Sequence, residues 1–139
     1  MISPLNSAIS GLQAHVKKLG VTAHNIANVN SEGYKKYSAT MEEDALGGVK
    51  VNIRRVETPG HPYEIMEDGQ PVTKETSNVD LTQEIPNLMI AQRGYEANIK
   101  TIQAQEKVLG SLLDIVTWIL LASTSFSHPQ FHARRPFPV

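Results

Sequence analysis

The feature that most constrains this chain is a series of apolar residues near its N-terminus, spaced alternately three and four positions apart. Every position of the series is apolar over almost four heptads, which is typical of a helix that packs one stripe against a partner helix. The series is Ile2, Leu5, Ile9, Leu12, Val16, Leu19, Ala23 and Ile26. We predict a helix from Ser3 to Asn28, with Ser3 as the N-cap and Pro4 in the first turn.

The same spacing returns in the C-terminal half of the chain. The second series is Leu81, Ile85, Leu88, Gln92, Tyr95, Ile99, Ile102, Glu106, Leu109, Leu113, Val116 and Leu120. Asp80 followed by Gln83 resembles a capping box, so we predict a helix from about Asp80 to Leu121. Pro86 removes one intrahelical hydrogen bond. Either the helix kinks at Pro86, or its regular part begins near Ile85.

Residues 34–77, between the two helical segments, carry turn signals and strand patterns. Apolar residues at 49, 51 and 53 alternate with polar residues at 50, 52 and 54, which is typical of a half-buried strand. Residues 63–66 and 72–74, separated by a turn containing Asp68-Gly69, indicate a second and weaker hairpin. We therefore predict a small antiparallel β insert.

These patterns predict a mainly α protein, with long N- and C-terminal helices packed as a coiled coil and a small β insert. The predicted parts are residues 1–33, an N-terminal helix with an Asn-rich cap; 34–77, the insert; 78–122, the C-terminal helix; and 123–139, a flexible tail. Within the tail, residues 127–131 resemble the core of a streptavidin-binding affinity peptide, through coincidence or through cloning.

Composition argues against several classes of protein. The 139 residues carry 13 basic and 14 acidic side chains. Such a balanced charge creates no positive electrostatic potential that would attract nucleic acid. There is no cysteine, so neither a disulfide nor a thiolate site is possible. The N-terminus lacks the pattern of a cleavable signal, and the apolar residues 115–122 are too few to span a bilayer. We predict a protein that is not membrane-spanning.

The sequence also offers no constellation for catalysis. His15 and His24 are nine residues apart and point to opposite sides of a helix, so they cannot share a metal ion. The acidic residues at 42–44 and 67–68 are read as solvated loop charges. We therefore predict no enzyme, no catalytic residue, no cofactor and no metal.

Two stretches resemble the signatures of flagellar rod and hook proteins, a family of axial proteins. The first follows the N-terminal helix and contains Asn25, Ile26, Ala27, Asn28, Val29, Asn30, Gly33 and Tyr34. The second contains Asn78, Val79, Asp80, Leu81, Gln92, Arg93, Tyr95, Ala97 and Asn98. The short insert, with its turn at residues 59–62, is similar to that of proximal-rod members of this family. Pro86 and the residues beyond Val116 depart from the family pattern.

The resemblance implies a structural subunit of the bacterial flagellar basal-body rod, required for motility. Such subunits are exported from the cytoplasm through the flagellar type III export apparatus without signal cleavage. They self-associate, and assemble with other rod and axial proteins, around a channel in the periplasm. The expected subunit-packing residues are Ile9, Leu12, Val16, Leu19, Ile26, Leu88, Tyr95, Ile99, Ile102, Leu109 and Leu113. The alternative is a soluble coiled-coil adaptor or chaperone-like module, which periodicity does not exclude.

Overall fold

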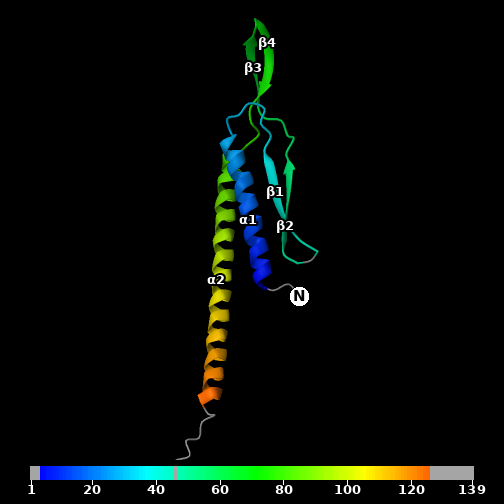
Figure 1. Ribbon diagram of the computed structural model, residues 1–139. Helices are drawn as coiled ribbons and strands as arrows, with labels where there is room; N and C mark the ends of the chain where they lie inside the picture. The colour runs from blue at the N-terminus through cyan, green and yellow to red at the C-terminus, as the bar shows by residue number, and fades with distance from the viewer. Residues whose placement is uncertain (1–3, 46, 126–139) are drawn as a thin grey trace, which may run out of the picture. The chain divides into compact units, whose positions relative to one another are not determined.

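The computed structural model describes residues 4–45 and 47–125, and Figure 1 shows its two helices and four strands. Two compact units are present, residues 1–103 and residues 104–139. The predicted tail beyond Ser125, with its affinity-peptide resemblance, lies outside the described residues, and so does Ser3. Within the described ranges, no helix has an apolar stretch long enough to cross a membrane.

The N-terminal helix, α1, runs from Pro4 to Ala27, so the predicted helix is present and ends one residue earlier than expected. Its last carbonyls are satisfied by the chain that follows. Asn28 donates its backbone N–H to the Asn25 carbonyl at 3.1 Å and its side-chain amide to the His24 carbonyl at 2.8 Å. Gly33 then adopts a φ of 62°, which glycine tolerates best. The Asn-rich stretch therefore ends the helix, as predicted.

Strands β1 (Tyr37–Glu43) and β2 (Val49–Arg55) form an antiparallel hairpin that contacts α1. The predicted strand at 49–54 is β2, whereas the sequence interpretation did not identify its partner β1. The face toward α1 is mostly apolar, with Met41 and Val51 half-buried. Ile53, at the end of the alternation, stays 46 % exposed. The backbone N–H of Val49 donates to Ser10 Oγ at 3.2 Å, which holds the hairpin along the helix.

Strands β3 (Pro62–Glu67) and β4 (Gln70–Glu75) form a second antiparallel hairpin, as the sequence predicted. The turn has positive φ at Asp68 and Gly69, the conformation that Asp-Gly turns favour. The insert is therefore two separate two-stranded sheets. A lone hairpin is marginally stable, and here an ion pair of 2.7 Å between Lys35 and Glu75 fastens it to the chain after α1.

The C-terminal helix, α2, runs from Leu81 to Ser125. Asp80 caps it by accepting a hydrogen bond from the Thr82 N–H at 2.9 Å, which confirms the predicted start. Because the helix begins five residues before Pro86, the alternative of a start near Ile85 is wrong. The helix also continues beyond Ala122, where the sequence predicted its end, so the apolar residues 115–121 are helical.

Candidate functional site

Residues 84–98 of α2 lie against residues 11–25 of α1. A Cβ added to Gly11 would lie 3.0 Å from Nδ2 of Asn98, whereas Asn25, near the other end of α1, donates to Glu84 at 3.3 Å. Because the partners of successive α1 residues run backwards along α2, the two helices are antiparallel. The predicted pairing of the helices is therefore present as a contact, and its description as a coiled coil remains a prediction.

Small residues let the two helices approach closely. Ala91 of α2 is fully buried and Ala14 of α1 is 2 % exposed. The His15 ring lies so close to Gly94 that a Cβ there would overlap it. Within the described residues, His15 Nδ1 is the one buried side-chain nitrogen or oxygen without a hydrogen-bond partner. Burial, and secondly the charge of Lys18, lowers the pKa of His15, so the neutral imidazole is favoured in this contact.

The buried line of each helix is displaced by one residue from the apolar series read in the sequence. Of the seven buried positions that the structure describes in the two helices, all but Ala14 share this displacement, as does the half-buried Asn98; they are Ala8, Gly11, Thr22, Asn25, Glu84, Ala91 and Asn98. Each precedes a member of an apolar series, in turn Ile9, Leu12, Ala23, Ile26, Ile85, Gln92 and Ile99. One residue is a rotation of about 100° in an α-helix. The apolar stripe therefore flanks the contact between the helices.

The expected subunit-packing residues lie on these flanking stripes. Seven are half-buried: Leu12, Leu19, Ile26, Leu88, Tyr95, Ile99 and Ile102. Four are exposed, namely Ile9, Val16, Leu109 and Leu113. Their assignment to contacts between subunits stays a prediction.

The helix pair presents different surfaces on its two sides. On α1, Gly11 faces α2, Ser10 lies about 100° to one side and bonds β2, and Leu12 lies about 100° to the other side. On α2, Ile85 follows the α1-facing Glu84 by the same rotation. Because the helices are antiparallel, these rotations bring both apolar stripes to one side of the pair. The first unit thus has a hairpin on one side of its helices and an apolar face on the other.

Asn25 is the most buried polar side chain of the joint between the helices and the insert, at 1 % exposure. Its Nδ2 donates to the Tyr37 carbonyl at 2.7 Å and to Glu84 Oε2 at 3.3 Å. Its Oδ1 accepts from the Tyr37 N–H at 2.9 Å and from the Tyr34 hydroxyl at 3.2 Å. Both amide donors and both lone pairs are used. One side chain of the predicted motif therefore ties α1 to β1, to α2 and to the intervening turn.

Charged groups complete this joint. Glu84 is 5 % exposed, and its Oε1 lies 3.7 Å from Lys36 Nζ, which also donates to Gln83 Oε1 at 3.3 Å. Burial first, and then the nearby Tyr37 and Glu84, raises the pKa of Tyr34. The phenol therefore stays protonated and can donate to Asn25. Sequence interpretation missed Glu84 and Lys36, although Glu84 stands seven residues before Ala91, the period of a buried helix position.

Asn78, from the second predicted motif, joins three segments. Its Nδ2 donates to the carbonyls of Val56 at 2.9 Å and Thr58 at 2.8 Å, and its Oδ1 accepts from the Lys36 N–H at 2.7 Å. Its backbone N–H donates to the Tyr34 carbonyl at 3.2 Å. The two motifs therefore meet in space, because Asn78 bonds the segment that follows Asn25.

The remaining motif residues have local roles or are accessible. Val29 and Val79 are half-buried, Gly33 forms the turn after α1, and Asp80 caps α2. The exposed members are Ala27, Asn30, Leu81, Gln92, Arg93 and Ala97. The structure thus brings Asn25, Tyr34 and Asn78 together in one joint and leaves the exposed members outside it.

The second unit begins at Ala104, and its part of α2 up to Ala122 has only one half-buried side chain, Gln105. Large apolar residues here are more than half exposed, from 52 % for Val116 to 75 % for Trp118. They include Val108, Leu109, Leu112, Leu113, Ile115, Val116, Trp118 and Ile119. A face of this size on a helix is unfavourable in water and is typical of an interaction surface.

The chemistry of the joint is hydrogen bonding and packing. Glu84 is engaged by Lys36 and Asn25, and Tyr34 donates to Asn25. Among residues 4–45 and 47–125, no group of three histidine, aspartate or glutamate side chains is placed to hold a metal ion. The arrangement fits a rigid connection between segments.

Comparisons with known protein families match both ends of the chain. Residues 5–35 match the family described as "Flagella basal body rod protein". Residues 74–115 match the family described as "Flagellar basal body rod FlgEFG protein C-terminal". The first match covers nearly all of α1, including Asn25, and the turn with Tyr34. The second covers Asn78, the cap of α2 and most of the predicted C-terminal series.

Individual relatives are of two kinds. The chain is 44 % identical to the flagellar hook protein FlgE of Escherichia coli over 41 residues, which is 30 % of this chain and 10 % of that protein. It is 29 % identical to the flagellar basal-body rod protein FlgC of Salmonella typhimurium over 125 residues, covering 78 % of this chain and 92 % of that protein. FlgC of Buchnera aphidicola is 28 % identical over 133 residues, 83 % of this chain and 97 % of its own length.

Proposed function

Because this chain belongs to the flagellar basal-body rod protein family, we propose that it is a structural subunit of the bacterial flagellar rod that assembles through its terminal helices. The chain spans about a tenth of the hook proteins that it matches, but nine-tenths or more of the two FlgC relatives. A rod subunit of FlgC type is therefore the more specific form of the proposal. Its role is mechanical, and we assign no residue to catalysis.

The observation that carries this proposal is the unused apolar surface of both helices. Val16 of α1 is 50 % exposed, and Ile85 and Met89 of α2 are 49 % and 57 % exposed. The second unit adds further exposed apolar side chains, among them Leu113 and Trp118. Burial is worth about 25 cal/mol for each Å² of apolar surface removed from water, so neighbouring subunits that cover these stripes gain a large driving force. We propose that the stripes pack between copies as coiled coils.

The partners of this function are other copies of the chain, other rod and axial proteins, and the flagellar export apparatus. The proposed location is the periplasmic part of the basal body, reached without cleavage of a signal. The exposed stripes suit export, because helices whose apolar faces await partners gain little stability alone and can remain unfolded during passage.

The first experiment measures the oligomeric state of the purified full chain over a range of concentrations, by analytical ultracentrifugation and electron microscopy. A rod subunit forms open helical stacks, because a head-to-tail interface need not close. A soluble adaptor instead stops at a small closed oligomer. A species of fixed size over a hundredfold range of concentration would therefore favour the adaptor.

The second experiment tests the stripes in a motile bacterium whose own rod gene has been replaced by this one. Leu12→Asp and Ile102→Asp place a charge in a face that assembly must dry, at a cost of several kcal/mol. Both should abolish incorporation into the basal body and swimming. His61→Ala, an exposed position, is the control and should swim normally. Normal swimming by either aspartate variant would contradict the proposed role of the stripes.

A further inference from the structure

The outward face of the β1–β2 hairpin is polar and has opposite charges at its two ends. The register places Ser38, Thr40, Glu42, Lys50, Asn52 and Arg54 on this face. The face toward α1 instead carries Ala39, Met41, Val49 and Val51, all half-buried. Hairpin contacts with α1 and the Ser10 bond to Val49 fix which face points outward.

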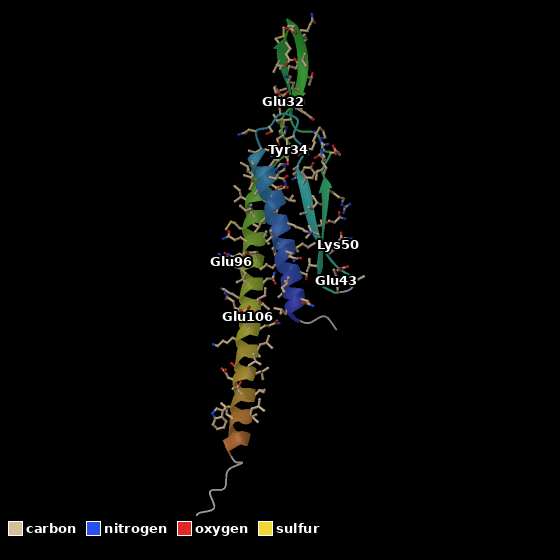
Figure 2. All side chains as sticks on the ribbon, viewed as in Figure 1. Glu32, Tyr34, Glu43, Lys50, Glu96 and Glu106 are labelled. Carbon is tan, nitrogen blue, oxygen red and sulfur yellow. The ribbon has the colours of Figure 1, made fainter. Side chains whose placement is uncertain are left out.

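One end, here called the tip, holds Glu42, Glu43 and Asp44, all exposed, with Lys50 opposite Glu42. The other end, here called the base, holds Arg54 and Arg55. Figure 2 labels Glu43 and Lys50 near the tip of the hairpin. The tip remains acidic after the single lysine is counted, and the base is basic.

One charged residue at each end, Asp44 at the tip and Arg54 at the base, has no ion-pair partner within the described part of the chain. Arg55 lies 3.5 Å from Glu57. Arg54 is opposite Ser38, six residues before Asp44. At about 3.3 Å per residue the two side chains are roughly 20 Å apart, too far to meet inside one copy.

The hairpin is also aligned with the helix pair. Its tip lies beside Ser10, because a Cβ on Gly48 would be 2.8 Å from Ser10 Oγ. Its base lies beside Asn25, which bonds both backbone groups of Tyr37. The acidic and basic ends are therefore separated along α1, so translation of one copy along that axis brings a tip to a base.

From this geometry we infer that the β1–β2 hairpins of successive copies meet end to end. The acidic tip of one copy contacts the base of the next, which carries Arg54 and Arg55. The partner is a second copy of this chain, because the acidic end of one hairpin is complementary in charge to the basic end of another. Every copy has the same distance between these two ends, so the contact can repeat from copy to copy. This inference rests on the proposed rod function and adds the contact that sets the axial register. A repeated contact between different patches propagates as an open helix, and charge complementarity fixes register more than affinity.

Charge exchange tests the contact in the full chain. Asp44→Lys or Arg54→Glu should each raise the concentration needed for polymerisation by about three- to fivefold in dilute salt. The variant that carries both changes should recover most of this loss, because tip and base are complementary again. Glu64→Lys, on the exposed face of β3, changes the net charge equally and is the control. Equal effects of Asp44→Lys and Glu64→Lys, or no recovery in the double variant, would overturn the inference.

Cross-linking gives an answer that does not depend on polymer yield. The chain has no cysteine, so the variant Asp44→Cys/Arg54→Cys carries two thiols that cannot bridge inside one copy, since a disulfide requires Cα atoms within about 7 Å. Mild oxidation should produce a ladder of covalent multimers, and Glu64→Cys/Arg54→Cys should not. If the variant polymerises but oxidation yields no ladder of covalent multimers, this contact is wrong and the proposed rod function is unaffected. A chain that neither polymerises nor forms a ladder would reject both.

Discussion

Two stretches of the same helix, α2, differ in what they bury. Between Leu81 and Gln103, α2 contacts α1 through Glu84, Ala91, Gly94 and Asn98, which are small or polar. From Ala104 to Ala122 it is rich in large apolar residues, and nearly all of its side chains are exposed. Burial in the first stretch thus follows close approach and hydrogen bonding, whereas the large apolar residues of the second stretch are exposed.

This difference assigns separate tasks to the two stretches. The first determines the internal geometry of the chain, because residues such as Asn25 and Gly94 accept few substitutes. For the second we propose adhesion between copies, since apolar faces tolerate many residues of similar size. The following predictions test this separation, from the largest expected change in unfolding free energy to the smallest.

Asn25→Ala should cause the largest loss of stability. It removes four hydrogen bonds and leaves Glu84 and both backbone groups of Tyr37 without this partner. Each buried polar group left unsatisfied costs about 1–3 kcal/mol, so we expect a loss of about 3 kcal/mol or more in urea unfolding. Asn30→Ala, an exposed position in the same motif, is the control and should change stability by less than about 0.5 kcal/mol. Equal losses of unfolding free energy in the two variants would show that the buried hydrogen bonds of Asn25 are not what stabilises the chain.

Gly94→Ala should be the next largest effect, because a Cβ there overlaps the His15 ring. Overpacking costs about 1–3 kcal/mol, which exceeds the gain in helix propensity of about 1 kcal/mol from Gly to Ala. Gly110→Ala is a matched change in the second unit, where nothing lies within 4 Å of the added atom. It should therefore stabilise the helix. Thermal unfolding followed by circular dichroism would detect the opposite signs, and stabilisation by both would contradict a tight helix contact.

Acidification should weaken the first stretch through His15. Because burial and Lys18 lower its pKa in the folded chain, the unfolded chain binds more protons below the ordinary value of 6.5. This contribution to stability is full above that pH and is lost as the pH falls toward the lowered pKa. We expect the unfolding free energy to decrease between about pH 7.5 and pH 5.5.

The control for this pH effect is a pair of histidine variants. His15→Gln should flatten the dependence in that range, while His24→Gln, at an exposed position, should keep it. The carboxyl group of Glu75 does not interfere, because its hydrogen bond to Lys35 lowers its pKa below the usual 4.5. The same slope in all three proteins would exclude His15 as its source.

The sequence predicted the helices, strand β2, the hairpin of β3 and β4, and the cap at Asp80, because these depend on local pattern and turn chemistry. It did not predict β1, whose residues Tyr37–Glu43 alternate only weakly. Nor did it predict the line of contact between the helices. Apolar periodicity identifies the stripe that avoids water, and this stripe need not face the partner within the same chain. Here the small residues Gly11, Ala91 and Gly94 allow the two helices to come close together, and small residues do not appear in a search for large apolar side chains.

The joint was predictable only in part, for a related physical reason. Asn25, Asn78 and Tyr34 were identified through resemblance, whereas the importance of Glu84 and Lys36 depends on long-range geometry. Glu84 is 59 positions from Asn25 in sequence, and its seven-residue spacing from Ala91 does not by itself distinguish a buried carboxylate from an exposed one. A buried carboxylate needs compensating donors, and these come from α1 and from the segment before β1.

Leu113→Asp should have the smallest effect on the isolated chain and is the sharpest test of the separation of tasks. Leu113 is 67 % exposed, so its replacement removes little internal packing. Asp forms helices somewhat less well than Leu, which costs at most about 0.7 kcal/mol. The melting curve of dilute monomer should therefore stay close to that of the unsubstituted chain. Polymer formation should nevertheless be lost, because the charge would lie in a face that neighbouring copies dehydrate. Leu113→Met, a change that conserves volume at the same position, is the control and should leave both properties intact. A large destabilisation of dilute Leu113→Asp monomer would mean that the second unit has internal packing partners, and that adhesion and internal geometry are not divided along α2.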